Sequence, residues 1–173
     1  TGLDEILNGG LVKDSTVLVS GNPGTGKSLF GIQYLYTGVT EYDERGIYIS
    51  FEEDAEAIRD AATSIGFDEF GEFVDEGEIK IYDKTEMLRE SDFNATLETL
   101  LEDFADTSYD RLVLDSLTMF QLFFDDEAEE RTYLLKFSDI LKRNGLTSLL
   151  INEQGAVFPE TEIGLENFLT DGN

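Results

Sequence analysis

The chain has 173 residues, of which 40% are hydrophobic, and its 38 Asp and Glu against 12 Lys and Arg give a formal net charge of −26. This length suits one hydrophobic core, so we expect a single domain over residues 1–173. The chain has no Cys and no His, which excludes disulfides and thiolate chemistry and leaves a carboxylate, Lys or Tyr for any acid–base step.

Short β-rich runs alternate with amphipathic stretches along the chain. The expected strands are residues 16–20, 46–51, 79–82, 111–115 and 147–152. Several of them are apolar throughout, as strands buried on both faces are. Repeated strand–helix–strand units indicate an α/β fold with a mainly parallel central sheet and helices on both faces. Ligands bind such sheets at the carboxyl ends of the strands.

Four segments between these strands carry apolar residues at helical spacing. Their stripes are Leu29, Ile32, Tyr36 and Val39; Ile58, Ala61, Ala62 and Ile65; Phe93, Leu97, Leu100, Leu101 and Phe104; and Tyr133, Phe137, Ile140 and Leu141. We expect Asp54 to cap the start of the second helix and Gly145 to end the fourth. The acidic segment 66–77 is typical of a solvated connection.

A glycine-rich motif directly follows the first strand. The expected nucleotide-binding residues are Gly21, Asn22, Pro23, Gly24, Thr25, Gly26, Lys27 and Ser28, which match G-x-x-x-x-G-K-[ST], together with Leu29. Glycines let successive N–H groups turn inward to cradle phosphates, and the helix that follows adds the positive end of its dipole. Lys27 would reach the β and γ phosphates, and the Ser28 hydroxyl would bind Mg²⁺. The alternative is a glycine turn with a purely structural role.

Acidic residues end two further strands. Asp115 closes the run 111–115, at the position where P-loop proteins hold Mg²⁺, usually through a water; a capping or turn aspartate is the alternative. Glu52 and Glu53 follow the strand 46–51, at the edge where a carboxylate can orient or deprotonate the water that attacks a γ-phosphate. Their alternative role is to begin the next helix, where negative charge complements the helix dipole.

With these residues in place, the chain resembles a KaiC-like ATPase of the RecA-type P-loop superfamily. The resemblance runs through Thr1-Gly2-Leu3-Asp4, Gly9-Gly10-Leu11, the P-loop, residues 29–36, Phe51-Glu52-Glu53, Leu114-Asp115-Ser116 and residues 166–172. It implies ATP and Mg²⁺ as cofactors, and it makes Glu52 the general base with the catalytic Glu53 beside it. It also implies a homo-oligomeric ring, typically a hexamer, with ATP or ADP between subunits.

The chain departs from the family pattern in its last third. KaiC carries an arginine after the glutamate at the fifth strand, where this chain has Glu153-Gln154. A glutamine there resembles the γ-phosphate sensor of recombinases, which makes Gln154 a candidate. The family also continues into further strands, so residues 1–173 look like a domain that lacks its C-terminal strands and any trans-acting Lys or Arg on them.

The acidic composition indicates the salt concentration of the source cell and the classes of partner to expect. Self-repulsion destabilises so charged a chain unless salt screens it, and at molar salt the Debye length falls to about 3 Å. We therefore expect a halophilic archaeal source, with an acidic protein of an ordinary cell as the alternative.

A surface with so many carboxylates repels nucleic acid. No apolar stretch approaches a membrane span and no signal peptide opens the chain, so we expect a cytoplasmic protein without a membrane partner.

Three other functions stay open. A RecA- or RadA-type DNA-dependent ATPase would share the fold, but residues 120–130 and 155–164, where recombinases carry DNA loops, contain no Lys or Arg. A nucleotide-binding assembly module would keep the P-loop and turn over little ATP. Autophosphorylation would need an acceptor Ser or Thr, and none stands in a recognisable motif.

Overall fold

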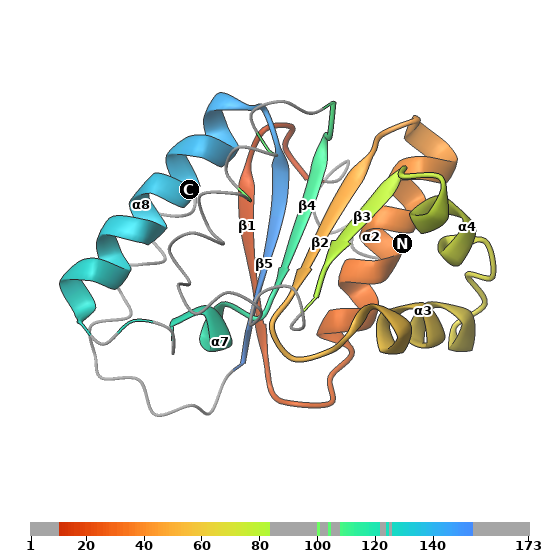
Figure 1. Ribbon diagram of the computed structural model, residues 1–173, viewed down its shortest axis with the longest axis horizontal. Helices are drawn as coiled ribbons and strands as arrows, with labels where there is room; N and C mark the ends of the chain where they lie inside the picture. The colour runs from red at the N-terminus through yellow and green to blue at the C-terminus, as the bar shows by residue number, and fades with distance from the viewer. Residues whose placement is uncertain are drawn as a thin grey trace.

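The strands that the structure describes form one parallel sheet (Figure 1). The computed structural model describes residues 11–83, 100, 104, 108–121, 124 and 126–153. The strands are β1 (Thr16–Gly21), β2 (Gly46–Ser50), β3 (Ile79–Tyr82), β4 (Arg111–Asp115) and β5 (Thr147–Glu153). They lie in the order β1-β5-β4-β2-β3, and each neighbouring pair is parallel. The α/β class and the parallel sheet predicted from the sequence are confirmed.

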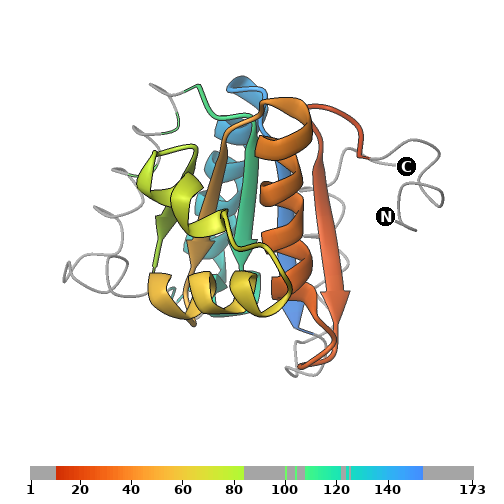
Figure 2. The same ribbon diagram turned by 90° about the vertical axis from the view of Figure 1, so that its right-hand side faces the viewer.

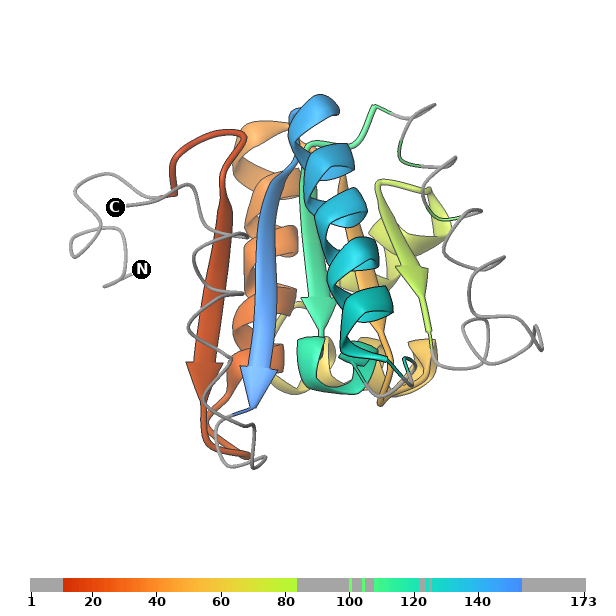
Figure 3. The same cartoon turned by 90° about the vertical axis from the view of Figure 1, so that its left-hand side faces the viewer.

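Helices lie on both faces of this sheet (Figures 2 and 3). One face carries α2 (Lys27–Tyr42), α3 (Ala55–Ser64) and α4 (Phe70–Asp75), the other carries α8 (Glu127–Arg143), and the short α7 (Leu117–Gln121) follows β4. The arrowheads in Figure 1 all point to one edge of the sheet, which we name the carboxyl edge. Among the described residues, no helix combines the length and apolarity that crossing a membrane requires.

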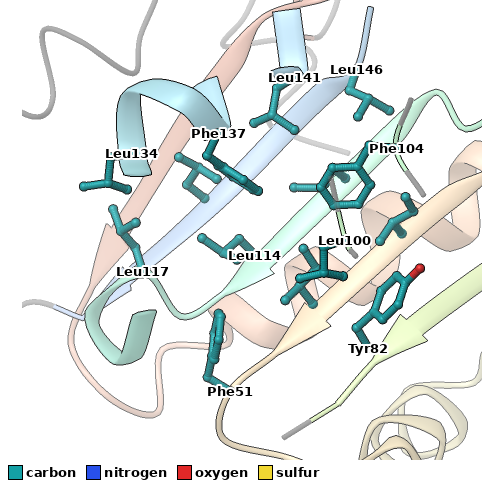
Figure 4. Close-up of a cluster of buried hydrophobic side chains, with 14 residues drawn as sticks. Phe51, Tyr82, Leu100, Phe104, Leu114, Leu117, Leu134, Phe137, Leu141 and Leu146 are labelled. Carbon is teal, nitrogen blue, oxygen red and sulfur yellow. The ribbon is translucent and has the colours of Figure 1, made fainter. Parts of the chain in front are cut away.

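Strand side chains alternate between two hydrophobic cores. On β4, Leu112 and Leu114 belong to the core under α8, whereas Val113 belongs to the core under α2. On β2, Ile49 faces α8 and Tyr48 faces α2. Figure 4 shows the α8-side core, with Phe51, Leu117, Leu134, Phe137 and Leu141 among its members. Burial on both faces explains why these strands read as apolar throughout.

The predicted helix signals agree with the observed ends. Asp54 Oδ1 accepts a hydrogen bond from the Ala57 backbone N–H at 2.9 Å, which confirms the cap of α3. Past the end of α8, Gly145 adopts a φ of +65°, a left-handed conformation that glycine reaches without strain.

The predicted stripes lie on α2, α3 and α8, with one exception. Ile65 lies one residue beyond α3 and is 38% exposed, so it does not join the core. Of the stripe within residues 93–104, Leu100 and Phe104 are described, and both are buried in the α8-side core.

Segment 66–77 is not the solvated connection that the sequence indicated, because it contains α4. Phe70 is fully buried, and the Phe67 ring stacks on Tyr36 with centroids 4.3 Å apart. Phe73 contacts the same Tyr36 ring at 5.7 Å. Phe70 and Phe73 lie three residues apart in α4, and Phe67 lies three residues before the helix begins, a spacing that the dense acidic residues obscured.

α2 approaches the sheet so closely that a Cβ at the contact point would crowd the strand side chains. A Cβ at Gly31 would lie 2.8 Å from Val113 Cγ1, 3.3 Å from Ile151 Cδ1 and 3.6 Å from Tyr48 Cε2. The first distance is shorter than carbon atoms adopt in packed interiors. The helix is therefore held at a short, fixed distance from β4, β5 and β2.

Replacing Gly31 tests this approach. We expect Gly31→Ala to lower the free energy of unfolding by about 1–3 kcal/mol, because the added methyl overpacks the core. Gly71→Ala is the control: its Cβ would meet only Arg59 Nη1 at 3.5 Å, and alanine favours the helix that contains it. Urea unfolding followed by circular dichroism measures both, and equal stability of the two variants would contradict the close approach.

Acidic residues far outnumber the bases that could pair with them. Ion pairs join Arg111 to Glu44 at 2.6 Å and Arg59 to Asp75 at 2.7 Å. Even if every Lys and Arg paired with one acid, the formal net charge of −26 would remain. Repulsion among these carboxylates opposes folding at low ionic strength.

Salt should therefore stabilise the fold. Raising KCl from about 0.1 M to about 2 M shortens the screening length from about 10 Å to below about 3 Å, so the free energy of unfolding should rise. Urea titrations at several KCl concentrations measure it. NaCl at equal ionic strength should act alike, because screening depends on ionic strength. A stability that is flat or falls over this range would show that repulsion is not limiting.

Candidate functional site

Four connections meet at the carboxyl edge of the sheet. They are the loop from β1 to α2, the loop from β2 to α3, the end of β4 with α7, and the end of β5 (Figure 1). Because β5 lies between β1 and β4, its last residues separate the glycine-rich loop from Asp115. The distribution of polar residues at this edge defines the candidate site.

The glycine-rich loop is a compact turn around one carbonyl. Gly24 and Gly26 have φ values of +77° and +84°, in the left-handed region that glycine reaches without strain. The Asn22 carbonyl accepts hydrogen bonds from the Thr25 backbone N–H at 3.3 Å and from Thr25 Oγ1 at 2.9 Å. Residues 22–26 are exposed, so the outer side of this turn is open to a ligand.

The start of α2 differs from the starts of α3 and α8. Asp54 and Asp126 cap α3 and α8 through their carboxylates, whereas Gly26 precedes α2 without a side-chain cap. The first turn of α2 also carries no acidic residue, in a chain that has 38. Its first N–H groups have no partner within the helix, so they and the helix dipole remain available to an anion.

Lys27 is the first residue of α2, and its side chain is buried. Its ammonium donates to the Asn22 carbonyl at 3.0 Å and lies 3.9 Å from Glu153 Oε1. The positive charge therefore lies within the loop, between the turn and the end of β5. Sequence reasoning considered Glu153 only as the neighbour of Gln154, and its contact with Lys27 was not predicted.

A buried phenol binds Asp115, one of the two expected magnesium ligands. The Tyr48 hydroxyl donates to Asp115 Oδ2 at 2.7 Å. Burial raises the pKa of Tyr48 well above its ordinary value of 10.0, and the charge of Asp115, its hydrogen bond and the charge of Glu53 raise this pKa further. A hydrogen bond with the Ser28 side chain acts in the opposite direction. Tyr48 therefore remains a neutral donor at physiological pH.

Glu52 and Glu53 leave the end of β2 beside Asp115. The Phe51 N–H donates to the Asp115 carbonyl at 2.9 Å and so continues the contact between β2 and β4 past the end of β2. Glu52 Oε1 accepts a hydrogen bond from Ser116 Oγ at 2.8 Å, and the Glu53 N–H donates to Ser50 Oγ at 3.0 Å. Both glutamates are exposed, so they can meet a ligand at this edge.

α7 is tied to the end of β5 through one threonine. Thr118 Oγ1 donates to Asn152 Oδ1 at 2.8 Å and accepts from the Glu153 N–H at 3.2 Å. The peptide bond between Asp115 and Ser116 is cis. These contacts join the end of β4 to the neighbouring strand at the same edge.

Most residues singled out from the sequence therefore gather at one edge. The loop residues Gly21 to Gly26, with Lys27, Ser28 and Leu29, stand at the β1–α2 junction. Asp115 ends β4, two places from β1 in the sheet, and Glu52 and Glu53 follow β2, three places from β1. Gln154 lies outside the described residues. Sequence reasoning missed Tyr48, because a tyrosine in a buried strand gives no signal of its own, and it assigned no role to Ser116.

Comparisons with known proteins agree with this arrangement. A family model described as "ATPase: KaiC" matches residues 1–173. The circadian clock oscillator protein KaiC of Synechococcus elongatus is 34% identical over 177 residues, covering 98% of this chain and 34% of that protein. The UPF0273 protein PF1931 of Pyrococcus furiosus is 33% identical over 185 residues, covering 97% and 74%. The chain thus spans about a third of the length of the KaiC proteins that it matches.

A solved structure shares the fold. The KaiC-like protein PH0186 from Pyrococcus horikoshii OT3 superposes with a TM-score of 0.81 at 32% sequence identity, covering 98% of this chain and 74% of that one. This likeness confirms the expected RecA-type architecture.

Proposed function

The chain belongs to the KaiC family of ATPases, and from this we propose that it binds ATP with Mg²⁺ and hydrolyses it, as a regulatory or signalling ATPase. One observation carries the proposal: the uncapped, acid-free start of α2 faces the same edge as two carboxylate positions, Asp115 and Glu52. ADP and phosphate would be the products.

Phosphate binding follows from the donors at the β1–α2 junction. The N–H groups of the loop and of the first turn of α2 would surround the phosphates, and the helix dipole would add to their positive potential. The Lys27 ammonium would leave the Asn22 carbonyl and Glu153 for the β and γ phosphates. This exchange requires only a side-chain movement, because the ammonium is already inside the loop.

The chemistry of the donors suits Mg²⁺. This ion prefers oxygen ligands and usually takes one or two from the protein, the rest being phosphate oxygens and waters. Ser28, at the start of α2, offers a hydroxyl, and Asp115, at the end of β4, offers a carboxylate that the Tyr48 hydroxyl binds. Within the described part of the chain, no three His, Cys, Asp or Glu side chains gather into a metal-binding group. When bound, the ion would neutralise charge on the phosphates.

Hydrolysis would use the glutamates at the end of β2. Glu52, held by the Ser116 hydroxyl, would orient the attacking water and accept its proton, with Glu53 beside it. Lys27 and the loop N–H groups would stabilise the charge that develops on the γ-phosphate oxygens. The Ser116 hydrogen bond supports this role because it fixes one oxygen of Glu52.

Removing the charge of Glu52 separates binding from turnover. We expect Glu52→Gln to bind ATP as the unaltered chain does, while phosphate release falls roughly 10²- to 10⁴-fold through loss of the base. Glu56→Gln makes the same change one turn further along, at an exposed site in the first turn of α3, and should leave the rate unchanged. Isothermal titration and a phosphate-release assay in molar KCl measure the two quantities. Full turnover by Glu52→Gln would remove Glu52 from this role.

We propose that the chain comes from a high-salt archaeal cytoplasm.

We also propose that the chain assembles into a homo-oligomeric ring, as the family resemblance implies. In molar KCl, ATP should shift the protein from a small species to a ring of about six subunits, measured by light scattering after size exclusion. Lys27→Ala should stay small, because it cannot hold the phosphates that lie between subunits. Identical sizes with and without ATP would contradict nucleotide-dependent assembly.

A further inference from the structure

The middle of β2 carries a tyrosine whose hydroxyl lies at the proposed metal site. Tyr48 is 1% exposed, and its register partner on β4 is Val113. Ser50, two residues further along β2, pairs with Asp115. Residues two apart in a strand share a face, so Tyr48 and Asp115 both lie on the α2 side of the sheet. The tyrosine side chain is long enough to span this offset and reach Asp115.

The ring of Tyr48 is fixed by the close approach of α2. A Cβ at Gly31 would lie 3.6 Å from Tyr48 Cε2, so the ring packs beneath the helix that begins with Lys27 and Ser28. The ring has little freedom to turn there, because cores are close-packed. Its hydroxyl is therefore presented to Asp115 in one fixed direction.

The Tyr48 hydroxyl binds one oxygen of the Asp115 carboxylate. It donates its only proton to Asp115 Oδ2, at a distance of 2.7 Å. A phenylalanine would fill the same volume and would need no partner in a core that is otherwise largely apolar. Packing alone therefore does not account for the hydroxyl of Tyr48.

We propose that Tyr48 is a positioning residue for the magnesium–nucleotide complex. By engaging Oδ2, it orients the Asp115 carboxylate so that Oδ1 is left for the ion or its bound water. Partners of this kind around metal ligands commonly change metal affinity when they are removed. The inference rests on the proposed nucleotide function of the same edge.

Tyr48→Phe tests the inference with a readout other than turnover. ADP binding is measured by isothermal titration across a series of free Mg²⁺ concentrations and in EDTA. We name the free Mg²⁺ concentration that gives half of the Mg²⁺-induced increase in ADP affinity the Mg²⁺ midpoint. This midpoint should be about tenfold higher in the variant, in line with the 10- to 100-fold effects of such partners on metal affinity. The ADP affinity in EDTA should stay unchanged. An unchanged Mg²⁺ midpoint in Tyr48→Phe would overturn the positioning role.

Tyr34→Phe is the matched control. The Tyr34 hydroxyl also makes a partly buried hydrogen bond, to the Thr147 carbonyl at 2.9 Å, but Thr147 begins β5 at the opposite edge of the sheet. This variant should lose stability in urea without moving the Mg²⁺ midpoint. If both variants lose stability and neither moves the midpoint, the role of the Tyr48 hydroxyl is structural only and the inference is wrong.

A double-mutant cycle tests whether Tyr48 acts through Asp115. In the Asp115→Asn background, the further change Tyr48→Phe should add little to the loss of Mg²⁺ dependence, because coupled residues are not additive. Full additivity would overturn the proposed route.

The outcomes also separate the two proposals. If the unaltered chain binds Mg²⁺ and ADP but releases no phosphate, hydrolysis fails while the Tyr48 comparison stands; if it shows no Mg²⁺-dependent binding, both proposals fail.

Discussion

The parallel direction of the five strands among the described residues is the constraint on which the site depends. Backbone hydrogen bonding sets Gly21 opposite Glu153, Ile151 opposite Asp115, and Asp115 opposite Ser50. The ends of four strands are thereby brought together at one edge, although their residues are far apart in the sequence. The functional side chains need no attraction for one another to meet there, because the ladder and the cores beneath it determine their positions.

Charge alone does not distinguish functional carboxylates in a chain with 38 of them. What separates them is the partner that each has in the structure. Asp54 accepts from the N–H of a helix, Asp115 accepts from a buried phenol, and Glu52 accepts from the buried Ser116 hydroxyl. Carboxylates that accept hydrogen bonds from fixed donors have a defined direction, which is what water activation and metal binding require. The acid-free first turn of α2 is the complementary feature.

The sequence allowed the strands to be predicted to within a residue, because burial on both faces produces unbroken apolar runs. The cap of α3 and the end of α8 were equally predictable, since each depends on one local residue. Phe67, Phe70 and Phe73 were overlooked among acids, although they follow helical spacing. Tyr48 could not be found in this way, because its contact with Asp115 spans 67 positions and depends on strand order. Gln154 lies outside the described residues, so its expected role stays a prediction.

One side chain joins the dry core to the polar edge. The ring of Tyr48 packs under Gly31, whereas its hydroxyl contacts Asp115 at the carboxyl edge. Gly31 also approaches Val113 and Ile151, so the helix that presents Lys27 and Ser28 is set against the strands that carry the remaining polar groups. Any shift of α2 away from the sheet would move the ring and the phosphate loop together. The apolar packing under α2 therefore determines not only stability but also the direction of the hydrogen bonds at the site, which a low local dielectric strengthens.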